Sequence, residues 1–253
     1  MQGNSWQGVS VAELERASHS AVPALRTAFD GPFLLRAFLG GTGRANAISS
    51  LDPAPDGGLQ ARLARIEAAY ARMGLPPRFR STPLDPPGLE EALLARGYAE
   101  KDETLVMAGP LSGFAAPDPA VEVLAAPDEA WLSVVASVDY QTEQRRAEKM
   151  QAPQLMLLPA AWLLLRVGGR PAVAGQVASD GQLVGFFDIA TAPEFRRQGL
   201  GGRLIAAGAA WGQRQGALTG WLQVSAGNSP ARSVYTRLGM REIYRYRYFL
   251  PKN

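Results

Sequence analysis

The residues from Arg196 to Gly202 (Arg-Arg-Gln-Gly-Leu-Gly-Gly) combine positive charge with backbone that can approach a ligand closely. The apolar run from Leu183 to Ala190 predicts a strand before them, and the Ala-rich sequence after them predicts a helix. The first N–H groups of a helix have no partner inside the helix, and the helix dipole favours an anion there. Two arginines beside such a helix start predict a pyrophosphate site.

A second pair of polar residues follows the strand predicted from Gly220 to Ser225. Asn228 stands directly before Ser229-Pro230. A purely structural interpretation is that its side chain caps the next helix, since Pro suits a first helical turn. Tyr235 lies in that helix and carries a hydroxyl that can donate a proton. It also shares a helical stripe with apolar residues, so a purely structural buried tyrosine is the alternative interpretation.

The second half of the chain, residues 121–250, resembles the GNAT superfamily of acyl-CoA-dependent N-acetyltransferases. The loop signature of that superfamily is Arg or Gln, two variable residues, Gly, one variable residue and Gly or Ala, which matches Arg196 to Gly201. A second signature, a strand, an Asn and a helix that ends in a Tyr-x-x-x-Gly pattern, matches Asn228 and Tyr235 to Gly239. Both motifs occur in the expected order and spacing.

The resemblance implies a role for each of these residues. Acetyl-CoA is the implied co-substrate, with no metal. Tyr235 is the implied general acid that protonates the leaving CoA thiolate. Asp188 is the nearest carboxylate in sequence for a general base, although strand alternation could turn it away from the cleft. The remaining residues would bind the cofactor through loop N–H groups, arginine charge and the strand edge that polarises the thioester: Ile189, Ala190, Thr191, Arg196, Arg197, Gln198, Gly199, Leu200, Gly201, Gly202 and Asn228.

The two halves of the chain match at an offset of 142 residues. Gly74 and Gly97 each follow a predicted helix, as do Gly216 and Gly239, and Glu100 matches Glu242. We interpret this as a decayed structural duplication. The expected fold is therefore α/β (α+β): a mixed, mostly antiparallel GNAT-type sheet flanked by helices and present twice.

The first half lacks the chemistry of a cofactor loop. Its matching segment, Ala54 to Leu59, contains glycines but no arginine, and it places Asp56 where a pyrophosphate would meet negative charge. The glycine run Gly40 to Gly43 reads as a turn, because no helix start follows it. We expect this degenerate half to shape the acceptor pocket or to pack as a pseudo-dimer partner.

The expected domains are residues 1–112, without a cofactor loop, and residues 121–253, the catalytic domain. The Pro- and Gly-rich residues 113–120 form the expected linker. In the first half, residues 10–29 are predicted to form a helix and residues 44–51 a strand. The assembly is expected to be a monomer that is a pseudo-dimer, or a homodimer.

Composition excludes several other classes of function. The net charge of +3 is mild and the basic residues are scattered, which argues against nucleic acid as a partner. The chain has no cysteine and one histidine, His19, so a metal site and a His-dependent triad lack their residues. No apolar run approaches the length of a membrane span, and a cytoplasmic location is expected.

The expected function is transfer of an acetyl group from acetyl-CoA to a primary amine of a small molecule or peptide. The amine would attack the thioester directly, without an enzyme nucleophile. The alternative is a catalytically silent CoA-binding module with a regulatory or assembly role. The sequence does not indicate which amine is the acceptor.

Overall fold

The computed structural model describes residues 8–138 and 141–252. The α-helices among them are α1 (Val11–Ala21), α2 (Leu59–Arg72), α3 (Leu89–Ala95), α4 (Glu129–Ala136), α5 (Glu143–Leu155), α6 (Leu200–Arg214) and α7 (Ser229–Arg237). The strands are β1 (Arg26–Asp30), β2 (Phe33–Ala37), β3 (Ile48–Ser50), β4 (Phe79–Ser81), β5 (Tyr98–Pro110), β6 (Val121–Leu124), β7 (Ala160–Val167), β8 (Arg170–Ser179), β9 (Leu183–Thr191), β10 (Thr219–Ser225) and β11 (Arg241–Pro251). Short 3-10 helices are η1 (Gly43–Ala45), η2 (Leu111–Gly113) and η3 (Pro193–Phe195).

The strands of the described residues form one sheet in the order β1-β2-β3-β4-β11-β5-β10-β9-β8-β7-β6. Only β3–β4 and β9–β10 pair in parallel, and the other neighbours are antiparallel. The prediction of a mixed, mostly antiparallel sheet flanked by helices is confirmed.

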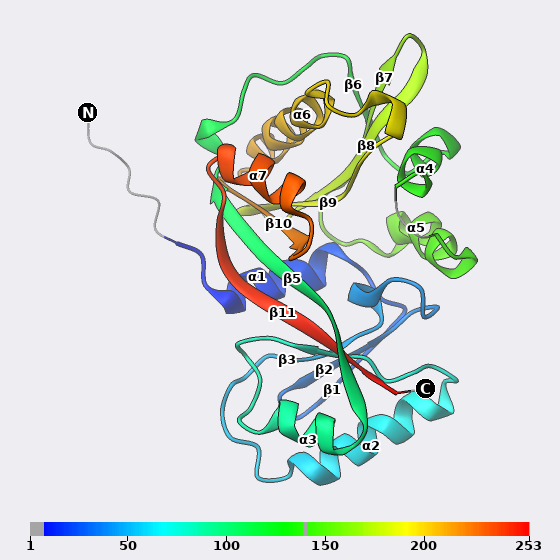
Figure 1. Ribbon diagram of the computed structural model, residues 1–253, viewed down its shortest axis with the longest axis vertical. Helices are drawn as coiled ribbons and strands as arrows, with labels where there is room; N and C mark the ends of the chain where they lie inside the picture. Colours follow the sequence, from blue (N-terminus) through cyan, green and yellow to red (C-terminus); the bar gives the residue numbers. More distant parts are fainter. Residues whose placement is uncertain (1–7, 139–140, 253) are drawn as a thin grey trace.

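The two halves of the chain exchange their last strands. β5 belongs to the first half in sequence but pairs with β10, and β11 belongs to the second half but pairs with β4. β5 and β11 also pair with each other at the centre of the sheet. Figure 1 shows them as two long strands that run together from the half with α6 and α7 to the half with α2 and α3.

The register of the central pair supports the interpretation of a duplication. Glu242 is paired with Met107, and Glu100 is paired with Phe249. Residue 242 lies 142 positions after residue 100, and residue 249 lies 142 positions after residue 107. The offset found in the sequence therefore relates each of these two residue pairs to the other. The parallel pairs β3–β4 and β9–β10 occupy equivalent places on either side. The sheet therefore has approximate two-fold symmetry about the β5–β11 pair.

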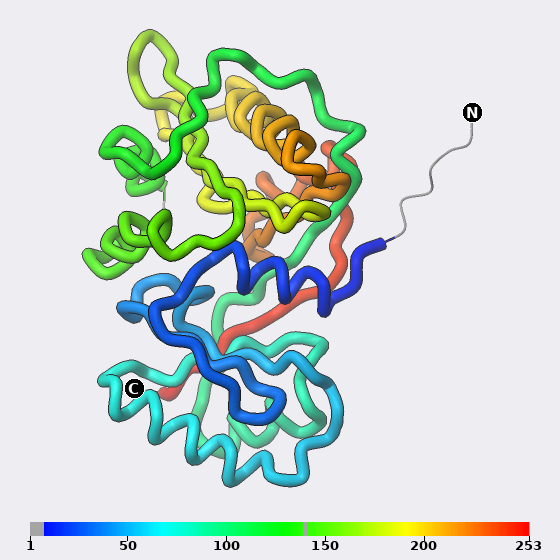
Figure 2. The backbone as a smooth tube through the Cα atoms, turned by 180° about the vertical axis from the view of Figure 1, so that it is seen from behind, coloured from blue at the N-terminus to red at the C-terminus, as the bar shows by residue number. Residues whose placement is uncertain are grey.

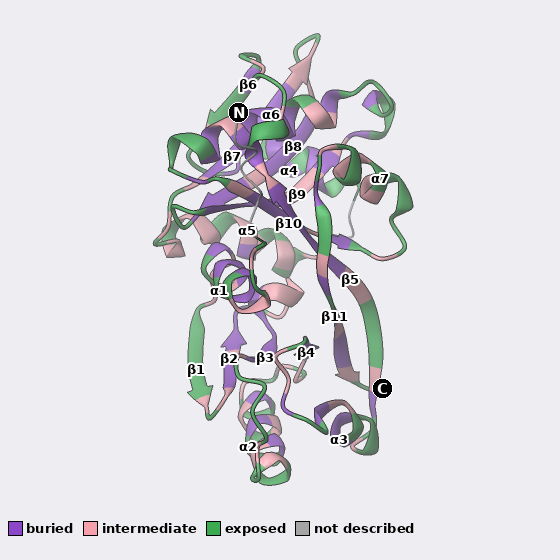
Figure 3. Ribbon diagram, turned by 90° about the vertical axis from the view of Figure 1, so that its left-hand side faces the viewer, coloured by how far each residue is buried: buried purple, intermediate pink, exposed green. Residues whose placement is uncertain are grey.

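Helices cover both faces of the second half of the sheet. Leu163 and Leu165 of β7 pack in one apolar cluster with residues of α6, including Leu204. Their neighbour Leu164 packs in another cluster with Trp131 of α4. Because alternate residues of a strand point to opposite faces, α6 and α4 lie on opposite sides of the sheet. Figure 3 shows the resulting concentration of buried residues on β8, β9 and β10.

Helix α1 lies where the two halves meet (Figure 2). Its fully buried Glu15 forms an ion pair with Arg80 of β4 and accepts a hydrogen bond from the hydroxyl of Tyr244 on β11. On the same helix, the hydroxyl of Ser18 accepts a hydrogen bond of 3.0 Å from Gln223 of β10. One helix thus contacts the sheet of both halves.

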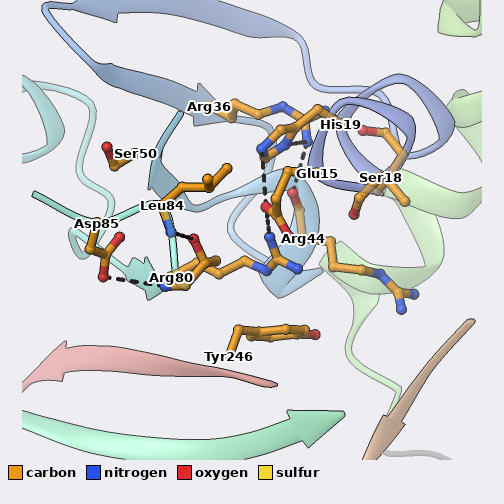
Figure 4. Close-up of polar contacts among 12 residues, drawn as sticks. Glu15, Ser18, His19, Arg36, Arg44, Ser50, Arg80, Leu84, Asp85 and Tyr246 are labelled. Carbon is orange, nitrogen blue, oxygen red and sulfur yellow. Dashed lines mark hydrogen bonds and ion pairs between the residues drawn. The ribbon is translucent and has the colours of Figure 1, made fainter. Parts of the chain in front are cut away.

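His19, the single histidine of the chain, belongs to the buried cluster around Glu15 (Figure 4). The Nε2 atom of His19 lies 3.6 Å from the Glu15 carboxylate, and its Nδ1 lies 3.2 Å from the guanidinium of Arg36. Burial lowers the pKa of His19 well below its usual value, and the charges of Arg36 and Arg80 lower it further. The ring is therefore neutral and packs within the fold.

Two predictions for the first half are wrong. The helix expected over residues 10–29 ends at Ala21, and residues 26–30 form β1 instead. Pro23 explains the break, because proline disfavours helical backbone at the residue before it, and Val22 is extended. The strand expected over residues 44–51 is reduced to β3, since η1 occupies its beginning.

The proposed division at residues 113–120 separates the halves in sequence but not in the sheet. Residues 1–7, 139–140 and 253 of the proposed domains lie outside the described residues. Because β5 precedes this segment and pairs with β10, the second half without β5 would leave the edges of β10 and β11 unpaired. Unpaired strand edges promote aggregation or strand exchange between chains.

We predict that a fragment of residues 121–253 aggregates or forms dimers by strand exchange when it is expressed alone. Co-expression with residues 1–120 should restore a soluble complex of the size of one chain, measured by size-exclusion chromatography with light scattering. As a control, the full chain cut at a protease site inserted between Ala115 and Ala116 should stay assembled. If the fragment of residues 121–253 were monomeric and folded cooperatively, the second half would not need β5 to fold, and the prediction would be wrong.

Candidate active site

A large cavity opens where β9 and β10 separate. The parallel pairing of these strands ends at Phe186 and Leu222, whereas β10 continues to Ser225 alongside β5. The space beyond this point is a cavity of about 1060 Å³. It is open along the edge of β9 that faces β10, where the backbone has lost its strand neighbour.

A β-bulge in β9 accompanies the separation. Between its pairing with β8 at Phe187 and at Ala190, β9 contains one more residue than β8. Asp188 lies in this bulge with φ of 50°, a left-handed conformation that is uncommon for a residue with a side chain. The bulge interrupts the ladder beside Ile189, and Asp188 lines the cavity at this point.

Eight of the predicted site residues line the cavity: Asp188, Ile189, Ala190, Thr191, Arg196, Arg197, Asn228 and Tyr235. The other five form the adjoining loop and the first turn of α6: Gln198, Gly199, Leu200, Gly201 and Gly202. The Leu200 side chain is buried in the core, so only its backbone is available to a ligand. The structure therefore gathers the two sequence motifs in one place.

The loop before α6 has the geometry of an anion site. Arg197 and Gly199 have φ of 60° and 74°, and Gly199 caps α6 without any side-chain hydrogen bond. Within the described residues, no acceptor is present for the N–H groups of Gly199, Leu200 and Gly201. A Cβ atom added at Gly199 would meet nothing within 4 Å. These donors lie beside the exposed Arg196 and Arg197, an arrangement that suits an anion.

The equivalent helix start in the first half is already occupied by a carboxylate of the chain itself. Before α2, the Asp56 side chain accepts a 3.0 Å hydrogen bond from the N–H of Gly58. It also forms an ion pair of 2.6 Å with Arg62. The hydrogen bond from Arg62 lowers the pKa of Asp56, so the carboxylate is charged. A second anion would be repelled here.

Tyr235 projects from α7 into the cavity. Its ring packs against the core of the second half and is partly buried. Within the described residues, its hydroxyl has no hydrogen-bond partner. Burial raises the pKa of Tyr235 above its usual value, so the hydroxyl keeps its proton at neutral pH.

Asn228 has the structural role that the sequence allowed as an alternative. Its side-chain oxygen accepts a 3.2 Å hydrogen bond from the N–H of Ala231 and caps α7. The exposed side chain also lines the cavity. Its contact with a cofactor stays a prediction.

Asp188 is surrounded by positive charge. Its carboxylate forms an ion pair with Lys149 of α5, and it lies 3.6 Å from the guanidinium of Arg44. Burial acts to raise the pKa of Asp188, but the charges of Lys149 and Arg44 outweigh it and leave the pKa below its usual value. Such a carboxylate is ionised at all working pH values and accepts protons poorly.

Sequence reasoning missed the two cations that hold Asp188. Arg44 follows the glycine run Gly40 to Gly43 in the first half, and its guanidinium also lies 5.4 Å from the centroid of the Phe187 ring. Lys149 belongs to a helix with mixed charges and lies 39 residues before Asp188. No local sequence pattern connects Arg44 and Lys149 with Asp188. The one local signal is the position of Arg44 directly after a glycine turn, where a cation can line a site.

Two further features concern residues 8–138 and 141–252. None of their helices is both long and apolar enough to cross a membrane. No group of three or more His, Cys, Asp or Glu side chains in these ranges is arranged to hold a metal ion.

Comparison with known proteins yields matches over almost the whole chain. A family model described as "Probable histone acetyltransferase Rv0428c C-terminal" matches residues 9–249. The chain is 25% identical over 248 residues to the uncharacterised N-acetyltransferase YobR of Bacillus subtilis (strain 168), covering 96% of this chain and 99% of that protein.

Solved structures share the fold at low sequence identity. A GCN5-related N-acetyltransferase from Kribbella flavida superposes with a TM-score of 0.72 at 18% identity, covering 97% of each chain. A tandem GNAT protein from the clavulanic acid biosynthesis pathway has a TM-score of 0.65 at 13% identity, covering 98% of this chain and 92% of that one.

The ion pairs at Asp188 lead to a prediction about its titration. In a Lys149→Met variant, the pKa of Asp188 should rise, because burial then acts against less positive charge. Titration of the carboxyl carbon by NMR measures this directly. Lys101→Met removes a cation that makes no contact with Asp188 and is the matched control. An unchanged Asp188 pKa in Lys149→Met would show that the ion pair does not control this carboxylate.

Proposed function

This chain belongs to the GNAT superfamily of N-acetyltransferases, and we propose that it transfers an acetyl group from acetyl-CoA to a primary amine. The amine would belong to a small molecule or a peptide. The observation that carries this proposal is the meeting of the glycine loop before α6 with the bulge in β9 in one cavity.

The residues of this cavity fit an acyl-CoA. Unpaired N–H groups at Gly199, Leu200 and Gly201 suit the oxygens of a pyrophosphate, with Arg196 and Arg197 adding charge. The edge of β9 from Ile189 to Thr191 offers backbone groups for an extended amide-containing arm. A volume of about 1060 Å³ lies just above the range of about 300–1,000 Å³ that is usual for ligand sites and leaves room for a long cofactor.

Acetyl-CoA, when bound, supplies a thioester that the free amine of the acceptor attacks directly, with release of the CoA thiol. Backbone N–H groups along the edge of β9 that lines the cavity would stabilise the negative charge that develops on the thioester oxygen. The Tyr235 hydroxyl keeps its proton and has no hydrogen-bond partner among the described residues, so we assign it as the general acid toward the departing sulfur.

The electrostatics of Asp188 modify the role expected from sequence. Because its pKa lies below the usual value, it is a weak general base. We propose instead that Asp188 orients the ammonium group of the acceptor, whose proton then leaves to water. The acid limb of the pH–rate profile would then follow the pKa of the acceptor amine rather than that of Asp188.

One prediction concerns the cofactor loop. Gly199→Glu should weaken acetyl-CoA binding by at least about tenfold, because it places negative charge and a side chain beside the unpaired N–H groups. Gly199→Asn, which tolerates the left-handed conformation, should weaken it less. Asp56→Ala in the first half should bind as the wild type does. Isothermal titration calorimetry measures all three, and lost affinity in Asp56→Ala would show that the halves are wrongly assigned.

A second prediction concerns the acid. Tyr235→Phe should lower kcat by roughly tenfold or more and leave the KM for acetyl-CoA nearly unchanged. The assay follows release of the CoA thiol over a panel of primary amines. An unchanged kcat would assign protonation of the thiolate to another group. Tight acetyl-CoA binding by the wild type without turnover on any amine would favour the silent binding module.

A further inference from the structure

A second cavity, of about 490 Å³, adjoins the first at Asp188 and Arg44, which line both. Its walls come from both halves: the loop before β3, the residue before β4 and two residues of β5 on one side, and α5 and β11 on the other. Its position next to Asp188 makes it the place for the acceptor, if the proposed function is correct.

The walls of this acceptor cavity are strongly basic. Five cationic side chains line it, against the two carboxylates of Asp102 and Asp188: Arg44, Arg78, Lys101, Arg145 and Lys149. Arg44 and Lys149 are paired with Asp188. Arg145 contacts the carbonyl of Gly41 at 3.4 Å. Arg145 also makes a further interaction. The cationic side chains that line the cavity outnumber the carboxylates that line it.

Two of these cations have no carboxylate within ion-pair distance among the described residues, Arg78 and Lys101. The guanidinium of Arg78 lies 5.8 Å from the ring centroid of Tyr248, which is itself buried on β11. A guanidinium held against an aromatic ring loses little freedom when it binds a carboxylate or phosphate with two parallel hydrogen bonds. In addition, the buried Nε of Arg44 has no hydrogen-bond partner.

We propose that the acceptor is a small amine that also carries an anionic group, a carboxylate or a phosphate. Its ammonium group lies at Asp188, next to the cofactor cavity, and its anionic group lies at Arg78 and Lys101. This inference rests on the proposed function and names its substrate class. A lysine-rich peptide is disfavoured, because its remaining ammonium groups would face the basic walls, and like charges in close contact are costly.

The test compares amines that differ only in the anionic group. The pairs are 4-aminobutyrate with n-butylamine, for a carboxylate, and O-phosphoethanolamine with ethanolamine, for a phosphate. A lysine-rich peptide completes the panel. We expect the wild type to show a higher kcat/KM for the anionic member of at least one pair, and the better pair identifies the anionic group.

Arg78→Gln and Lys101→Gln should each raise the KM for the preferred anionic amine by about tenfold or more. The kcat, the KM for the uncharged partner and the affinity for acetyl-CoA should stay nearly constant. Arg214→Gln, which removes an exposed charge at the end of α6, controls for net charge. The proposal would be overturned if the wild type had a higher kcat/KM for the peptide or the uncharged amines and Arg78→Gln left these values unchanged.

A binding measurement separates this proposal from the proposed function. Calorimetry with the same anionic amines, in the presence of CoA, reports occupancy without turnover. Binding that is lost in Arg78→Gln together with absent turnover would contradict the acetyltransferase assignment but support an anion-selective cavity. If neither the anionic amines nor their uncharged partners bound, the proposal that the acceptor carries an anionic group would be wrong.

Discussion

The exchange of β5 and β11 is the constraint on which the rest of the structure depends. Each half places its last strand in the sheet of the other half, and the two strands pair with each other between them. A rotation of one half relative to the other would break backbone hydrogen bonds in three adjacent strand pairs. The two halves therefore behave as one body, and α1 adds contacts with both.

This rigid connection allows side chains from distant parts of the chain to form one charged cluster. Arg44 comes from the first half, whereas Lys149 and Asp188 come from the second, and the three meet beside the bulge in β9. A buried carboxylate with two cations needs fixed geometry, because the Coulomb gain must offset the loss of hydration. A flexible hinge between the halves would not provide that geometry, but a shared sheet does.

Local signals predicted much of the fold and the cofactor loop. The helices that end before Gly74 and Gly216 were predicted, and the loop before α6 followed from glycines and arginines at a helix start. Pro23 is a local signal too, because it disfavours helical backbone at Val22 and so ends α1 at Ala21. The strand exchange was out of reach, because a repeat offset shows which strands are equivalent but not which sheet each joins. Arg44 was missed for the same reason.

The two helix starts related by the offset show how the halves differ in function. At α2 the chain supplies its own anion, Asp56, and neutralises it with Arg62, so this site is satisfied internally. At α6 the equivalent N–H groups are left open between arginines. The first half has no open helix start of this kind among the described residues, and its loops and β5 contribute Arg44, Arg78 and Lys101 to the cavity proposed for the acceptor. Because the exchanged strands fix this wall against the neighbouring cavity, the proposed roles give the first half, rather than the half with the glycine loop, the selection of the acceptor by charge.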